Sequence, residues 1–334
     1  MRFTRLRVSA AVAATLVVAA AAGAARAGGS PGAIVFSRYD SDGNPHVMVT
    51  TPSGGEREIA LPYPGDEPLW SPNGQKLLVL VFTPNDGVRP ATLNADGSGF
   101  QALHITGLPD GTDFTCHAWS PNGQRLLCQA INFNGDNEAD GVYSVRSSDG
   151  GDLTRLSVNP YPPEVTEGCC FGGGDIPGGF SPDGKQFVFM RAKPGPDPVH
   201  PDNGQSGALY VENTDGTNLH QIAPFGAANS HDDAVERWSP DGKWIVFAGD
   251  DFTLQLIHPD GSGQHAVPIP ADPAGRSFAF TPSWSPDGKR IVFSLYRPTP
   301  DQEDIYTVRP DGSELTQVTN TPEFEDFANW RSQP

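Results

Sequence analysis

The residues of this sequence best suited to chemistry are carboxylates that recur a few positions before an aromatic residue. They are Asp66, Glu67, Asp113, Asp175, Asp232, Asp233, Glu325 and Asp326, and His231 adjoins two of them. Carboxylates held close together raise one another's pKa or share a cation. If the fold gathers these segments, they form a site for a divalent cation such as Ca²⁺ or for a basic ligand group. The alternative is that each carboxylate accepts hydrogen bonds from loop amides and faces water.

One of these segments, His231-Asp232-Asp233, places a histidine beside two acids. Such a histidine ligates a metal, moves a proton or forms a surface ion pair. If a cation binds, we expect Asp232, Asp233 and Asp175 among its ligands. No Gly-x-Ser-x-Gly motif lies on a predicted strand-to-helix turn, so we assign no catalytic residue.

A repeated hairpin must position these residues. In Trp284-Ser285-Pro286-Asp287-Gly288, Pro286 presets φ for a type I turn and Gly288 takes the left-handed conformation that closes the hairpin. The apolar run Ile291-Val292-Phe293 then predicts a strand. Copies begin at Trp70, Trp119, Phe180 and Trp238, and a shortened copy is Asn329-Trp330. Successive copies lie about 46 to 61 residues apart, and each interval holds a second turn with Asp-Gly, which gives four strands per interval.

This period is the size of one propeller blade, and it predicts an all-β, six-bladed β-propeller of four-stranded antiparallel blades. Residues 33–61 match the last three strands of a blade but lack the first hairpin, whereas residues 326–331 carry the first-strand pattern with nothing after it. We therefore expect the C-terminal strand to pair with the N-terminal strands and close the ring. The repeat fills the chain, so residues 28–334 form one domain.

The two ends of such a propeller differ. The tight turns between the first and second strands, and between the third and fourth, gather on one face. The longer connections emerge on the other, with long insertions at 159–179 and 191–207. Because recognition tends to reside on irregular loops held by a rigid scaffold, we interpret the second face and the adjoining channel mouth as the functional face. The recurring carboxylates, just upstream of the inner strands, should then surround the mouth.

The four cysteines allow three pairings in an exported protein. If Ser120 opposes Gln124 across the turn, the hairpin register places Cys116 opposite Cys128, within reach of a disulfide. Cys169 and Cys170 are then left as neighbours, either as a strained vicinal ring or as free thiols.

The N-terminus predicts export. Three arginines precede an apolar run from Val8 to Ala22, and Ala25-Arg26-Ala27 offers a cleavage site, so residues 1–27 are interpreted as a signal peptide. The alternative, a membrane anchor, requires a longer apolar run, and we expect no membrane insertion after cleavage. The formal charge is −18, and residues 1–27 contain four arginines and no acid, so the mature charge is about −22. This charge disfavours nucleic acid and is compatible with metal cations or basic protein patches, although it also serves solubility alone.

The repeated Trp-Ser-Pro-Asp-Gly-Lys followed by Ile-Val-Phe, together with Ile305-Tyr306-Thr307-Val308-Arg309-Pro310-Asp311-Gly312, resembles the repeat of the TolB-type propellers. The resemblance covers essentially the whole mature chain. It implies the fold, and it implies a role among exported proteins that bind partner proteins, or among propellers that cover a peptidase active site or carry a metal in pectin-degrading lyases. In this sequence we find neither the α/β domain that precedes the propeller in TolB nor a hydrolase domain, so we do not expect the envelope-complex role of TolB or proteolysis.

We therefore expect a secreted or periplasmic, monomeric and non-catalytic propeller that binds a protein, peptide or glycan ligand at the loop face and channel mouth. The alternative is a metal-dependent lyase or hydrolase that acts on an extracellular polymer, with the carboxylates and His231 as its site.

Overall fold

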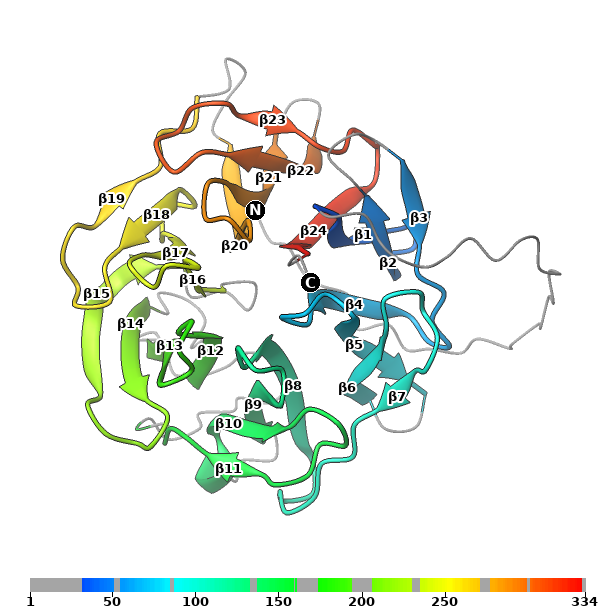
Figure 1. The fold of residues 1–334 in the computed structure, drawn as a ribbon, viewed down its shortest axis with the longest axis vertical. Coiled ribbons are helices and arrows are strands. Elements are labelled where there is room, and N and C mark those ends of the chain that lie inside the picture. The colour runs from blue at the N-terminus through cyan, green and yellow to red at the C-terminus, as the bar shows by residue number, and fades with distance from the viewer. Residues whose placement is uncertain are drawn as a thin grey trace, which may run out of the picture.

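Six four-stranded antiparallel sheets form a ring in the computed structural model (Figure 1). It describes residues 32–50, 55–84, 87–132, 137–158, 160, 174–193, 206–229, 235–270, 277–298 and 301–331. The predicted six-bladed propeller is confirmed. The signal peptide, Cys169, Cys170, His231, Asp232 and Asp233 lie outside the described residues. No helix in the described part of the chain is long and apolar enough to cross a membrane.

Each blade has the same strand order from the axis outward. Blade 1 consists of β24 (Phe324–Trp330), β1 (Ile34–Tyr39), β2 (Pro45–Thr50) and β3 (Glu56–Glu58). Blade 2 consists of β4 (Gly65–Trp70), β5 (Lys76–Thr83), β6 (Gly87–Asn94) and β7 (Gln101–Ala102). Blade 3 consists of β8 (Thr112–Trp119), β9 (Arg125–Asn132), β10 (Gly141–Arg146) and β11 (Thr154–Arg155), with the short 3₁₀ helix η1 (Asn137–Ala139) before β10.

Blades 4 to 6 follow the same plan. Blade 4 consists of β12 (Gly174–Phe180), β13 (Gln186–Lys193), β14 (Ser206–Asn213) and β15 (His220–Ala228). Blade 5 consists of β16 (Arg237–Trp238), β17 (Ile245–Ala248), β18 (Leu254–Ile257) and β19 (His265–Ala266). Blade 6 consists of β20 (Phe278–Trp284), β21 (Ile291–Arg297), β22 (Gln302–Val308) and β23 (Thr316–Gln317).

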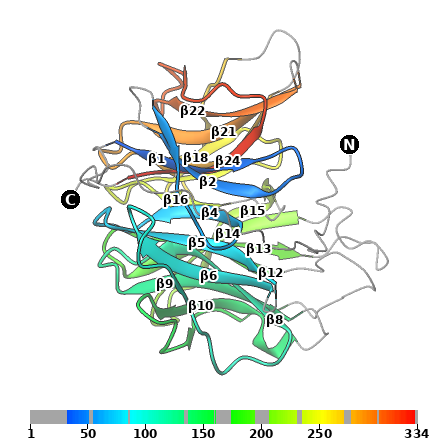
Figure 2. The same ribbon diagram turned by 90° about the vertical axis from the view of Figure 1, so that its right-hand side faces the viewer.

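The C-terminal strand closes the ring as predicted. β24 pairs antiparallel with β1, with Ile34 opposite Trp330 and Tyr39 opposite Phe324. Figure 1 shows the red β24 beside the dark-blue β1, and Figure 2 shows the same blade from the side. The two ends of the chain thus share one sheet, which leaves no unpaired inner strand in blade 1.

The Ser-Pro-Asp-Gly turn forms because its polar groups bond one another. In blade 6, the backbone N–H of Gly288 donates to Ser285 O (2.9 Å), and Gly288 has a φ of +66°. The Ser285 hydroxyl donates to Asp287 (2.8 Å) and accepts from the backbone N–H of Arg290 (2.9 Å). These bonds satisfy the hairpin end, and blades 2 to 5 repeat them. We call the face that carries these turns the turn face and the opposite one the loop face.

The apolar core lies between blades rather than within them. Each of the six buried clusters combines residues of two consecutive blades; for example, Val35 of blade 1 packs with Leu77 of blade 2. Burial of apolar surface therefore stabilises the ring as a whole, and no blade has a core of its own.

The inner strands begin earlier than the sequence predicts, and this corrects the position of the carboxylates. Asp66, Asp113, Asp175 and Asp326 lie inside β4, β8, β12 and β24, not in loops upstream of them. The physical reason is a β-bulge in these strands, where the register against the second strand shifts by one residue. The bulge lets pairing continue past the polar residues, although the alternation of apolar side chains is broken there.

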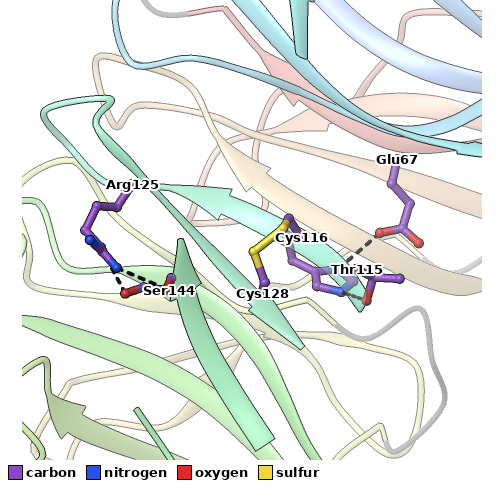
Figure 3. Close-up of a disulfide and its surroundings, with 7 residues drawn as sticks. Glu67, Thr115, Cys116, Arg125, Cys128 and Ser144 are labelled. Carbon is purple, nitrogen blue, oxygen red and sulfur yellow. Dashed lines mark hydrogen bonds and ion pairs between the residues drawn. A yellow bond between two sulfur atoms is a disulfide. The ribbon is translucent and has the colours of Figure 1, made fainter. Parts of the chain in front are cut away.

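The same bulge explains the disulfide. Cys116 pairs with Cys128 in the β8–β9 ladder, and their sulfur atoms are bonded (2.07 Å), so the predicted pairing is confirmed (Figure 3). The register assumed at the turn is wrong, because the backbone N–H of Ser120 donates to Arg125 O rather than facing Gln124. The extra residue between Cys116 and Ala118 shifts the ladder and restores the cysteine pair.

We expect this disulfide to add a modest stability, because it closes a loop between residues only 12 apart on strands that already pair. Replacing both cysteines by alanine should lower the free energy of unfolding by about 2 to 3 kcal/mol, as the chain-entropy relation gives for so short a loop. Urea unfolding of the two proteins measures the difference. Mass spectrometry of a non-reduced digest that finds Cys116 and Cys128 as free thiols would refute the bond itself.

Candidate functional site

Two of the predicted site residues join neighbouring blades. Asp66 is buried, and its carboxylate accepts hydrogen bonds from Ser37 Oγ (2.6 Å) and Tyr39 OH (2.9 Å) of blade 1. At the same repeat position of β24, Asp326 accepts from Thr281 Oγ1 (2.5 Å) and Ser294 Oγ (2.6 Å) of blade 6. Each aspartate also accepts the backbone N–H of the next residue at the bulge. Both carboxylates thus hold a bulge against the preceding blade.

Asp175 and Glu325 are also buried but pair with arginine. Asp175 receives Nε (2.6 Å) and Nη2 (2.7 Å) of Arg191, and Ser157 Oγ donates to it from blade 3 (2.8 Å). Glu325 pairs with Arg38 Nε (2.7 Å) across the β24–β1 ladder. Burial raises the pKa of Glu325, and Arg38 is one of the groups that oppose the rise. Each carboxylate therefore has its own partners.

Within the described ranges, the structure does not bring these acids into one cation site. Asp113 is exposed on β8. Among the described residues, no group of three or more His, Cys, Asp and Glu side chains could hold a metal ion. Of the three expected metal ligands, Asp175 is engaged with Arg191. Asp232 and Asp233 lie outside the described residues, as does His231.

Glu67 lines a small cavity together with residues of blades 5, 6 and 1. It occupies the bulge of β4 with a φ of +50°, and its carboxylate lies 3.1 Å from His117 Nδ1 of blade 3. The other ring nitrogen of His117 lies 2.8 Å from the Thr115 hydroxyl. Figure 3 shows Glu67 and Thr115 beside the disulfide-bonded hairpin. The three side chains form a carboxylate, imidazole and hydroxyl chain along which a proton could move.

Two adjacent residues of blade 5, Glu236 and Arg237, complete this layer. Arg237 donates through Nη2 to His117 O (3.0 Å) and through Nη1 to Gly178 O, so it links blade 5 to blades 3 and 4. Burial lowers the pKa of Arg237 to about 10, against the opposing charges of Glu236 and Glu67. Burial also raises the pKa of Glu236 to about 8, with Arg237 opposing the rise. The Oε2 atom of Glu236 has no hydrogen-bond partner in the described part of the chain.

The space beside Glu67 and Arg237 is small. A cavity of about 10 Å³ lies between them and Phe327, which is room for about one water molecule. The hydrogen-bonded Thr115–His117–Glu67 chain has the geometry for proton transfer. The cavity at its Glu67 end has room for a water molecule and not for a larger substrate.

Sequence reasoning missed Thr115, His117, Glu236 and Arg237. His117 takes the position that Pro68 and Pro282 hold in other blades, and nothing local shows that its ring reaches Glu67. The sequence Glu236-Arg237 could have predicted part of this site, because two adjacent charged residues stand directly before Trp238 in a strand that is otherwise expected to be buried. Such a pair indicates a buried ionic group.

The loop face carries a row of aromatic side chains, which we call the aromatic stripe: Phe252, Phe278, Phe280, Tyr296 and Phe324. The Phe252 ring meets Phe278 edge-on at 5.2 Å, Phe278 lies nearly parallel to Tyr296 at 6.0 Å, and Tyr296 lies nearly parallel to Phe324 at 6.5 Å. These residues occupy the beginnings of β20 and β24, the end of β21 and the connection after β17, all of which lie on the loop face. The stripe crosses blades 5, 6 and 1.

Acidic residues border the aromatic stripe. Asp250 and Asp251 precede Phe252, Glu323 precedes Phe324, and the hydroxyl of Tyr296 donates to Asp301 (2.6 Å). Phe324 is 41% exposed, which is high for a large apolar side chain. An aromatic surface edged by carboxylates suits a ligand with apolar groups and hydrogen-bond donors.

Comparison with known proteins supports the fold. No family model matches the sequence, and no curated protein does. The crystal structure of TolB from Acinetobacter baumannii is similar to 90% of this chain and 67% of that chain, with 15% identity and a TM-score of 0.63. A putative TolB from Agrobacterium tumefaciens is similar over 91% of this chain and 100% of that chain, with 17% identity and a TM-score of 0.58. Kuenenia stuttgartiensis hydrazine synthase matches 92% of this chain and 48% of that chain, with 11% identity and a TM-score of 0.61. The fold is a TolB-type six-bladed propeller, and at these identities the likeness extends to the fold alone.

Proposed function

We propose that this protein is an exported, non-catalytic propeller, secreted or periplasmic, that binds a protein, peptide or glycan ligand at its loop face and channel mouth. The observation that carries the proposal is the aromatic stripe, in which Phe324 is exposed and the other four rings are half-buried, because aromatic side chains gathered on one face of a rigid scaffold are typical of binding surfaces. The polar groups beside Glu67 bond one another and adjoin a water-sized cavity, so the loop face supports the proposal better than this cavity does.

The test is binding by variants of the aromatic stripe. Labelled protein is applied to peptide and glycan arrays, and the ligands that bind are then titrated in solution. We expect the double variant Tyr296→Ala/Phe324→Ala to weaken binding by about tenfold or more, because central aromatic contacts carry much of the energy of an interface. Leu219→Ala is the control, since Leu219 is 46% exposed in the tight turn between β14 and β15, on the turn face. Equal binding by the wild type and the double variant would refute the loop face as the binding face.

The metal-dependent lyase or hydrolase remains the alternative to be tested. It now depends on His231, Asp232 and Asp233, which lie outside the described residues. A cation that binds the folded state must raise the melting temperature by mass action. After chelator treatment, the melting temperature is measured with millimolar calcium, manganese or zinc, for the wild type and for Asp232→Asn/Asp233→Asn. Asp311→Asn, in a tight turn of the opposite face, is the control. An unchanged melting temperature with all three metals would remove this alternative.

A further inference from the structure

A second cavity lies on the turn face, between blades 3 and 4. Its volume is about 390 Å³, within the range of about 300 to 1,000 Å³ typical of small-molecule sites. Its walls include Pro121 and Asn122 of one turn, Asp183 of the next turn, and Phe180, Leu156 and Thr154. It is separated from the aromatic stripe by the thickness of the propeller, so it is independent of the proposed ligand at the loop face.

The residue at the end of the inner strand of blade 4 differs from the residue at the same position of the other blades. In the other blades this residue is tryptophan, and in blades 3 and 6 its indole reaches back to the preceding blade. Trp119 Nε1 donates to Leu69 O (3.3 Å), and Trp284 Nε1 donates to Arg237 O (3.1 Å). In blade 4 the residue is Phe180, which is shorter and has no N–H to donate. The aromatic ring therefore lines a cavity here.

The gap between blades 6 and 1 offers a comparison, because the polar side chains of blade 6 that face this gap resemble those of blade 3 that line the cavity. The two gaps differ in the aromatic residue opposite, which is Phe180 only beside the cavity. Arg290 bonds Thr307 and Thr316 on the face of blade 6, as Arg125 bonds Ser144 and Thr154 on the face of blade 3. Opposite the blade 6 wall stands Trp330, which packs in the cluster between blades 6 and 1. Opposite the blade 3 wall stands Phe180. A polar wall is thus common to both gaps, and the smaller ring is particular to the gap between blades 3 and 4.

The walls of the cavity suit a neutral ligand. The charge of Arg125 is offset by Asp152 (2.5 Å), and its N–H groups donate to Ser144, Asp152 and Thr154. An anion would therefore meet a guanidinium that is already paired. Asp183 accepts from Ser181 and from the backbone N–H of Lys185, and these bonds lower its pKa. It remains an ionised acceptor at neutral pH.

What these groups recognise together is a compact molecule with an apolar face and several hydroxyls. Phe180, Leu156 and Pro121 supply apolar contact, while Asn122, Thr154 and Asp183 supply an amide, a hydroxyl and a carboxylate. A pyranose ring has this character, since its C–H groups pack on an aromatic ring and its hydroxyls both donate and accept. The geometry points to a binding site for a neutral mono- or disaccharide between blades 3 and 4.

The test uses the substitution that the repeat itself supplies. Trp stands at this position in the other five blades, so Phe180→Trp should fold and place an indole in the cavity. A panel of glucose, galactose, maltose, cellobiose and N,N′-diacetylchitobiose is titrated against the full chain by calorimetry. We expect at least one of these sugars to bind, and Phe180→Trp to weaken its binding by about tenfold or more without lowering the melting temperature. Phe180→Leu, which keeps the space but removes the aromatic surface, should weaken it also.

Three controls test whether the saccharide binds in this cavity. Phe82→Trp makes the same change on an exposed phenylalanine of blade 2 and should leave saccharide binding unchanged. Tyr296→Ala/Phe324→Ala should also leave it unchanged, so that loss of the loop-face ligand and loss of the saccharide are told apart. Digalacturonate, which carries carboxylates, should bind more weakly than the neutral sugars. The inference is overturned if no neutral sugar of the panel binds, if digalacturonate binds more tightly than they do, or if Phe180→Trp binds as the wild type does.

Discussion

A chain that ends at Phe324 will fail to fold cooperatively at ambient temperature. The deletion removes nearly all of β24, the inner strand of blade 1, and it exposes apolar clusters that blade 1 shares with both neighbours. It also removes Asp326, which accepts hydroxyls of blade 6, and Asn329, which accepts the backbone N–H of Trp70 (2.9 Å) in blade 2. Because domains are stable by only about 5 to 15 kcal/mol, loss of an entire inner strand should exceed the margin.

The measurement is thermal unfolding followed by circular dichroism and by calorimetry. The control is a chain that ends at Arg331, which keeps every residue of β24 and the bond from Arg331 Nε to Gly74 O (2.9 Å). We expect this control to melt as the full chain does. If the chain ending at Phe324 shows the same cooperative transition at the same temperature, closure by β24 does not hold the ring together.

The fold could be predicted from the sequence because its determinants are local and repeated. A turn such as Ser285-Pro286-Asp287-Gly288 forms from bonds within six residues, and its recurrence sets the number of blades. Closure followed from the same pattern, since the N-terminal strands lacked a partner that the C-terminus supplied. The prediction of the disulfide rested on an assumed strand register between β8 and β9. That register is wrong at the turn but correct at the cysteines, because the bulge after Cys116 shifts the ladder by one residue.

The site could not be predicted to the same depth, because its contacts cross the ring. The repeat positions of Asp66 and Asp175 suggest one shared cluster of carboxylates. In the structure, however, Asp66 accepts a hydrogen bond from Tyr39 of β1, and Asp175 pairs with Arg191 of β13. The bulge also rotates Glu67 toward His117 while Asp66 turns to the preceding blade. Neighbours in sequence therefore have different roles, and the bulge determines which side chain turns to which blade.

The largest pH effect should come from Glu236. Its side chain is about 1% exposed and packs against Gly178, where an added Cβ would lie 2.7 Å from Glu236 Oε2. Burial raises its pKa from 4.5 to about 8. The folded state therefore holds a proton that the unfolded state releases, so the contribution of Glu236 is fully present below about pH 4.5 and is lost as the pH rises toward 8. The size of this effect is on the order of 5 kcal/mol, since the rise from 4.5 to about 8 already includes the opposing charge of Arg237 and one pKa unit corresponds to about 1.4 kcal/mol.

Replacing Glu236 by Gln removes this titration while it keeps the shape of the side chain. We expect Glu236→Gln to be more stable than the wild type at pH 8 to 9 and to show a flatter dependence of unfolding free energy on pH from 5 to 9. Urea unfolding at a series of pH values measures both slopes. Asp110→Asn is the control, because Asp110 is an exposed residue of the loop before β8 and should leave the slope of the wild type unchanged. Parallel pH profiles for the wild type and Glu236→Gln would show that Glu236 stays ionised beside Arg237 in the folded protein, and that the channel then holds a charged pair at neutral pH.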